Sequence, residues 1–172
     1  NDKPLVAAHN GLAFDNYFSF VSNLFLHGGW IHLIFNMWFM WIFSDNVEDR
    51  MGPWRFLAFY LICGVLATGM QWYFAPTLIV PVLGASGAIA GVLAAYYFLF
   101  PYERVIVYFF PVVLELPAIA FLGLWVIFQL YHITTSTYVE GMTMDSAWWA
   151  HLGGFIAGAC LYRFFLRKDA AV

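Results

Sequence analysis

The chain carries five long apolar stretches that are separated by short polar segments. They cover residues 30–45, 54–74, 85–100, 117–131 and 147–165. A helix needs about 20 mainly apolar residues to cross the hydrocarbon core of a bilayer, so the shorter stretches would borrow flanking residues. Pro53 and Pro117 stand at the beginnings of the second and fourth stretches, where a missing N–H costs a helix nothing. The pattern predicts an all-α transmembrane bundle with five spans.

Composition strengthens this prediction. Of the 172 residues, 63% are hydrophobic and only 10% are charged, whereas soluble domains average about 45–50% and about 25%. The length suits a single membrane domain over residues 1–172. The net charge of −3 and the lack of a basic, aromatic-rich patch exclude nucleic acid as a partner.

Basic residues predict how the bundle lies in the membrane. All but Lys3 follow the first, third or fifth stretch; they are Arg50, Arg55, Arg104, Arg163, Arg167 and Lys168. By the positive-inside rule these connections and the C-terminus are cytoplasmic. The region 1–29 would then be an outer loop, partly interfacial, and we expect a first transmembrane helix that this chain lacks. We expect a multi-pass protein of a bacterial inner or plasma membrane.

Four polar residues fall at one predicted depth, in the outer third of the membrane. His32 and Asn36 lie four residues apart on one face of the first span. Ser86 stands near the start of the third span, and His151 lies just inside the fifth. Polar groups at membrane depth are costly and are candidates for function. Their convergence predicts a site at this level.

The segment around Ser86 predicts how that site is built. Pro81 prevents one continuous helix, and Gly84 allows a turn, so a helix begins near Ala85. Its roughly 15 residues would be roughly 22 Å long, too short to cross. The head of this helix would therefore line a water-filled cavity below the outer surface. Exposed N–H groups at a helix start favour a developing anion.

Small residues predict a close approach of the third and fifth spans. They recur at intervals of four, as Gly87 and Gly91, and as Ala150, Gly154 and Gly158. Such faces let two membrane helices pack tightly, which would bring Ser86 within reach of His151. Imidazole is the usual base for a serine nucleophile. His32 and Asn36 would then stabilise the oxyanion, by about 3–4 kcal/mol per donor, in peptide hydrolysis within the bilayer.

At these residues the chain resembles the rhomboid family of intramembrane serine proteases. The matching motifs are HGGWIHLIFN from His27 to Asn36, GASG from Gly84 to Gly87, and Ala150-His151 followed by Gly154 and Gly158. Their order and spacing match along nearly the whole chain. The resemblance implies a six-helix core, of which this chain matches the part after the first helix.

The resemblance also implies the roles of the residues. The Ser–His dyad falls on Ser86 and His151, with no third, acidic member. The oxyanion partners fall on His32, Asn36 and the backbone N–H of Ser86. Some relatives place an aromatic residue four positions after the serine to stack on the histidine, where this chain has Ala90. Substrates would be single-span membrane proteins that are cut near the outer end of their transmembrane helix. The substrate helix would approach sideways, past the fourth span.

The same residues also allow a metal site. His27, His32 and His151 are of the type that binds zinc, but His27 and His32 are five apart, which is not a same-face spacing, and no HExxH motif is present. We therefore expect no metal and no cofactor. Gln129 is expected to form an interhelical hydrogen bond, and Cys63 and Cys160 to be free thiols. None of these three residues needs a catalytic role.

Two other functions stay open at this stage. An inactive rhomboid-like protein that binds membrane clients would share the fold, although such relatives typically lack the serine or the histidine. A transporter or channel would need internal repeats and a polar path through the bilayer, whereas the polar groups here stop in the outer third. The expected partners are the lipid bilayer and transmembrane-helix substrates.

Overall fold

The computed structural model describes residues 19–75, 84–109, 111–136 and 147–168. The elements are α2 (Ser19–Ser22), the 3-10 helix η1 (Asn23–Phe25), α3 (Trp30–Met51), α4 (Pro53–Phe74), α5 (Ser86–Leu99), β1 (Arg104–Phe109), β2 (Val112–Pro117), α6 (Ala118–Ser136) and α7 (Trp148–Phe165). The predicted outer loop is therefore described only from residue 19, and Pro81 lies outside the described residues.

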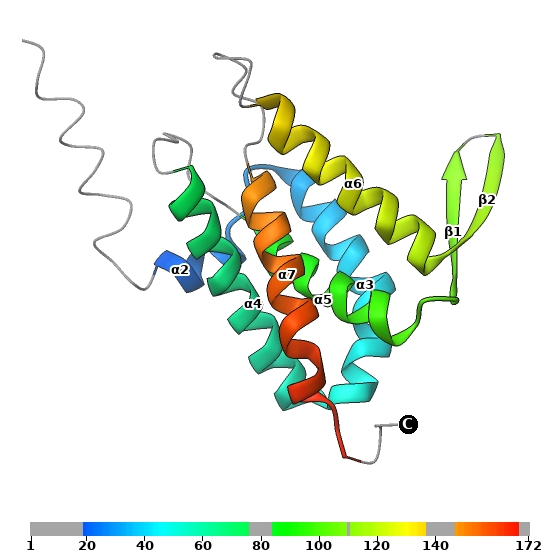
Figure 1. Cartoon of the computed structure of the whole chain (residues 1–172), viewed down its shortest axis with the longest axis horizontal. Helices are drawn as coiled ribbons and strands as arrows, with labels where there is room; N and C mark the ends of the chain where they lie inside the picture. Colours follow the sequence, from blue (N-terminus) through cyan, green and yellow to red (C-terminus); the bar gives the residue numbers. More distant parts are fainter. Residues whose placement is uncertain (1–18, 76–83, 110, 137–146, 169–172) are drawn as a thin grey trace, which may run out of the picture.

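Helix α5 is the centre of the bundle. It contacts α3, α4, α6 and α7, and every residue from Gly87 to Tyr96 is buried. Figure 1 shows α5 enclosed by its neighbours, with α7 beside it. A helix that is covered on all sides has to be apolar all round, which explains the unbroken small and aliphatic run of this segment. The predicted helical bundle is confirmed.

The small residues of α5 and α7 form the tightest contact in the bundle. A Cβ atom on Gly154 would overlap the carbonyl oxygen of Gly87, and one on Gly158 would overlap the carbonyl oxygen of Gly91. Backbones approach this closely only where side chains are missing. The predicted packing of the third stretch against the fifth is therefore confirmed. This contact sets the separation of the two helix starts that carry Ser86 and His151.

The helix lengths refine the predicted spans. Two of the described helical segments are long and apolar enough to cross a bilayer, Pro53–Phe74 and Ala118–Thr135, while α5 is a shorter apolar helix of 14 residues. The short α5 agrees with the expected start near Ala85. Helix α3 continues past its predicted end at residue 45, because the chain breaks only at Gly52, where φ is +81°, with Pro53 at the first position of α4.

A β-hairpin that the sequence analysis did not predict lies between α5 and α6. Strands β1 and β2 are antiparallel, with Val105 opposite Leu116 and Val107 opposite Leu114. Arg104 and Glu115 form an exposed salt bridge of 2.7 Å. The segment is rich in β-branched residues, which favour strands, but its length resembled that of a loop between two spans. Figure 1 shows the hairpin at one edge of the bundle, leading directly into α6.

Candidate active site

Ser86 is the first residue of α5, and a sharp turn places it there. Gly84 has a φ of +110°, which a residue with a side chain rarely adopts. Its N–H donates to the carbonyl of Asn23 at 2.9 Å, which ties the turn to η1. No side chain caps the start of α5 at Ala85. The first N–H groups of a helix lack partners within the helix, so the serine hydroxyl and backbone donors occur together.

His151 lies in the first turn of α7 and contacts Ser86 directly. Its Nε2 is 2.9 Å from the Ser86 Oγ. The backbone N–H of the preceding residue, Ala150, donates to Oε1 of Gln71 on α4 at 2.9 Å. This bond holds the head of α7 against α4. The structure therefore brings together the serine and the histidine that the sequence paired.

Gln129 on α6 binds the other side of the imidazole. Its Oε1 lies 2.9 Å from the Nδ1 of His151, and the glutamine side chain is buried. A carbonyl oxygen accepts hydrogen bonds, so this contact places the proton on Nδ1. Nε2 is then the acceptor that faces the Ser86 hydroxyl. The interhelical hydrogen bond predicted for Gln129 is thus present, but its partner was not predicted from the sequence, where the signal was a polar amide in an apolar span.

Two tryptophans flank the histidine. The ring centroid of Trp125 on α6 is 6.0 Å from that of His151, and the centroid of Trp148 on α7 is 6.1 Å away. Ala90, the position where some rhomboids have an aromatic residue, is fully buried instead. Its methyl group would meet a Cβ placed on Gly154 at 3.3 Å. A larger residue at Ala90 would separate α5 from α7, so the aromatic contacts to the histidine come from α6 and α7.

His32 and Asn36 both reach the turn before Ser86. A Cβ atom on Gly84 would lie 2.7 Å from the Cε1 of His32 and 3.4 Å from the Nδ2 of Asn36. Asn36 is buried, and its Nδ2 has no hydrogen-bond partner among the described residues. Buried donors are nearly always paired in proteins. An unpaired amide that lines the same cavity as Ser86 is thus a donor available to a bound ligand.

A cavity of about 150 Å³ joins three of the four predicted residues. Its lining comes from α3, α5, α6 and α7 and consists of Phe35, Asn36, Phe39, Ser86, Ile89, Leu93, Trp125 and His151. His32 is not part of this lining and approaches the site through Gly84. The roles of these residues in catalysis stay predictions. The part of the chain that the structure describes holds no group of three or more potential metal ligands, and Cys63 and Cys160 are free thiols.

Comparison with known protein families decides the fold family. The family model of the rhomboid domain matches residues 15–168. The chain belongs to the rhomboid family. The match covers every helix described above, and the resemblance inferred from the motifs is confirmed.

Similar rhomboid proteins come from yeast, plants and animals. The chain is 31% identical over 156 residues to Rhomboid protein 1, mitochondrial, of Saccharomyces cerevisiae, which covers 87% of the chain and 42% of that protein. It is 38% identical over 92 residues to Rhomboid-like protein 11, chloroplastic, of Arabidopsis thaliana, covering 54% and 31%. Presenilin-associated rhomboid-like protein, mitochondrial, of Homo sapiens is 36% identical over 89 residues, covering 51% and 24%. The chain spans less than half the length of each.

These relatives correct one prediction. The expected bacterial inner or plasma membrane is contradicted, because the rhomboid relatives are mitochondrial or chloroplastic by name and point to an organellar membrane. The prediction failed for a physical reason. The distribution of basic residues reports on which side a loop lies, but the bilayers of different compartments impose nearly the same requirements on span length and hydropathy.

Proposed function

We propose that this rhomboid domain is an intramembrane serine endopeptidase with Ser86 as nucleophile and His151 as general base. The observation that carries the proposal is the 2.9 Å contact between Ser86 Oγ and His151 Nε2. That distance is within the range in which a base takes a proton from a hydroxyl. The rhomboid family consists generally of such proteases, and this chain has both residues at the positions of the family motifs.

The proposed reaction proceeds through an acyl-enzyme. The Oγ of Ser86 attacks the carbonyl carbon of the scissile peptide while its proton passes to Nε2 of His151. The C–N bond then breaks, and the imidazolium gives the proton to the leaving amine. A water molecule, deprotonated by the same nitrogen, then attacks the ester carbonyl carbon. The bond to Oγ breaks, the imidazolium returns the proton to Ser86, and the carboxylic acid product is released. Gln129 keeps the second proton on Nδ1 throughout, so that Nε2 alone exchanges protons.

The negative charge on the carbonyl oxygen needs donors close to Ser86. The amide of Asn36 lines the same cavity and has a buried Nδ2 without a partner among the described residues. The N–H groups at the start of α5 add the positive end of the helix dipole. A single oxyanion donor contributes about 3–4 kcal/mol of transition-state stabilisation in the best-measured case. His32, whose ring approaches Gly84 from the same side as Asn36, is the third proposed donor.

The proposed substrate is a membrane protein with one transmembrane helix. The cavity lies between Phe35 and Phe39 of α3 on one side and Trp125 of α6 on the other. Helix α6 packs on α5 and α7 and on the hairpin, and large apolar residues such as Ile127 and Phe128 are exposed on it. A substrate helix would enter between α3 and α6. Its backbone must unwind there, because helical carbonyls are engaged in hydrogen bonds.

Cleavage by the purified protein in lipid vesicles tests the proposal. Ser86→Ala should abolish cleavage of a single-span model substrate and leave the melting temperature nearly unchanged. Ser44→Ala is the matched control, since Ser44 lies in the fourth turn of α3 and outside the cavity lining. A fluorophosphonate probe should form an adduct on Ser86, identified by mass spectrometry. Retained cleavage by Ser86→Ala would refute the assignment, and failure of the probe together with client binding would favour an inactive rhomboid.

A further inference from the structure

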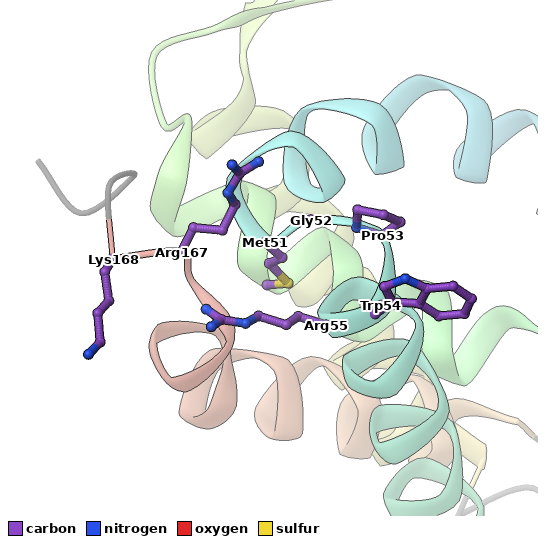
Figure 2. A pocket seen from close by; sticks show the side chains of 7 residues that line it. All are labelled: Met51, Gly52, Pro53, Trp54, Arg55, Arg167 and Lys168. Atoms are coloured by element: carbon purple, nitrogen blue, oxygen red, sulfur yellow. The ribbon is translucent and has the colours of Figure 1, made fainter.

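A second and larger cavity lies at the opposite end of the bundle from Ser86. Its volume is about 440 Å³, and its lining comes from the end of α3, the start of α4 and the segment after α7. Seven residues line it: Met51, Gly52, Pro53, Trp54, Arg55, Arg167 and Lys168. Figure 2 shows Arg55 extending from α4 toward the segment that carries Arg167 and Lys168. The proposed protease activity does not use this cavity.

The cavity is cationic, and hydrogen bonds maintain its shape. Three of its seven lining residues are basic and none is acidic. The Nη1 of Arg55 donates to the carbonyl of Leu166 at 2.8 Å, and the N–H of Arg167 donates to the carbonyl of Arg50 at 3.0 Å. These bonds fasten the segment after α7 to α3 and α4. Glu48 and Asp49 in the last turn of α3 are not part of the lining.

The start of α4, which lines the cavity, adds backbone donors. Helix α4 begins at Pro53, and no side chain caps its start. The first N–H groups of a helix have no partner within the helix and, with the helix dipole, favour a bound anion. Pro53 has no N–H, so the first N–H groups of this 22-residue helix belong to Trp54 and Arg55, which both line the cavity. Cationic side chains and a helix start thus act on the same space.

The position of α4 indicates which anion the cavity meets. The segment Pro53–Phe74 is long and apolar enough to cross a bilayer, so its first turn lies at the level of the lipid headgroups. Trp54 is 81% exposed there, and tryptophan is enriched at that level of the membrane. Basic pockets among transmembrane helices at this depth attract the phosphates of anionic lipids. Pro53, an exposed apolar residue of the lining, offers contact to the glycerol and upper acyl carbons, while Met51 is buried beneath the cavity.

We propose that this cavity binds the headgroup phosphate of an anionic phospholipid. The phosphate lies between Arg55, Lys168 and the first N–H groups of α4, and the acyl chains follow the outer surface of α4 past Trp54. A bound lipid would bridge α4 to the segment after α7. It would therefore stabilise the end of the bundle at which α3, α4 and α7 meet.

Competitive lipid binding to the purified full chain tests this proposal. The protein in neutral detergent is mixed with phosphatidylglycerol and phosphatidylcholine, and native mass spectrometry measures the ratio of the two lipids retained. Lys168→Gln should lower the affinity for phosphatidylglycerol about five-fold, the effect expected for one cation near the membrane surface. Lys168→Glu should lower it further. Arg55→Gln should act in the same direction, with the melting temperature recorded because Arg55 also holds Leu166.

Arg163→Gln is the matched control, because Arg163 is an exposed cation near the same end of α7 but does not line the cavity. It should leave the lipid ratio nearly unchanged. If Lys168→Gln and Arg163→Gln lower the affinity for phosphatidylglycerol equally, the attraction comes from the general positive charge of this surface and not from a site in the cavity. That result would overturn the proposal. The same holds if the protein shows no preference for phosphatidylglycerol. Displacement of the lipid by millimolar inorganic phosphate would assign the cavity to free phosphate instead.

Discussion

At the residue scale, one glutamine determines which nitrogen of the histidine faces the serine. Gln129 Oε1 and Ser86 Oγ lie 2.9 Å from opposite nitrogens of the same imidazole. With the Nδ1 proton engaged by the glutamine, the lone pair of Nε2 faces the hydroxyl. The arrangement resembles the orienting role of the third residue in a serine-protease triad, in which the acceptor fixes the tautomer. Here a neutral amide occupies that position.

Gln129→Met tests this positioning role. The change leaves a half-buried Nδ1–H without its acceptor, at a cost of about 1–3 kcal/mol, so kcat should fall about 5- to 150-fold with little change in KM. Gln129→Glu retains an acceptor oxygen and should recover part of the rate. The measurement is steady-state cleavage of a single-span substrate in vesicles.

Gln71→Met is the control for the loss of a buried amide. Gln71 also binds the head of α7, but through the backbone N–H of Ala150. Gln71→Met should lower the melting temperature clearly and should change kcat only slightly. Equal kcat losses in Gln71→Met and Gln129→Met would show that Gln129 has a structural role only and does not position His151.

At the scale of helices, the spacing of α5 and α7 determines whether Ser86 and His151 can meet. The glycines of α7 face the backbone of α5 so closely that even a methyl group on Gly154 overlaps a carbonyl oxygen. Because both reacting residues stand at the helix starts, a small separation of the axes is transmitted directly to the hydrogen bond between them. Packing and chemistry therefore depend on the same contact.

Gly154→Ala should destabilise the bundle and slow cleavage. Forcing a methyl group into a packed contact costs about 1–3 kcal/mol, and the shift of α7 should lengthen the Ser86–His151 contact. Gly123→Ala on α6 is the matched control, since a Cβ there meets no atom within 4 Å; it should be neutral or slightly stabilising through helix propensity. Thermal unfolding in detergent and cleavage rates measure both. Comparable behaviour of the two variants would contradict the packing argument.

At the scale of the whole molecule, the cavity beside Ser86 is bordered by α3 and by α6, which have different neighbours in the bundle. Phe35 of α3 and Trp125 of α6 both line it, and α6 packs mainly on α5, α7 and the hairpin. The segment between α5 and β1 holds the start of α6, because the N–H of Ala118 donates to the carbonyl of Glu103 and the N–H of Ile119 donates to the carbonyl of Pro101. The start of α6 is thus held, while the side toward α3 is where the proposed substrate enters.

Linking α3 to α6 should separate substrate entry from chemistry. Cysteines replace Phe35 and Trp125 in a Cys160→Ser background, because Cys160 is exposed and Cys63 is buried. A reducible bifunctional reagent that joins them should block cleavage of a single-span substrate but allow labelling of Ser86 by a small fluorophosphonate. Reduction should restore cleavage. Cleavage that survives linking would mean that entry does not occur between these helices, and loss of both activities would mean that the link acts on the catalytic residues themselves.

The sequence by itself determined the parts that depend on neighbours along the chain. Apolar length predicted the helices, the glycine at position 84 predicted where α5 begins, and the four-residue spacing of small residues predicted the contact of α5 with α7. The polar residues Ser86, His151, His32 and Asn36 were identifiable because each interrupts an apolar stretch. These are local properties, since they follow from backbone geometry and from the cost of polar groups in a membrane.

Only the tertiary structure decided which of these groups touch. Gln129 is 22 residues from His151 in sequence, and its partner depends on the rotation of α6 about its own axis, which hydropathy does not report. The hairpin was missed because a two-stranded pairing in a connection leaves little trace in an apolar pattern. The cationic cavity at the other end likewise requires Arg55 and Lys168 to meet from different elements. Helix rotation and long-range docking are set by packing over the whole bundle, so no single stretch of the chain contains them.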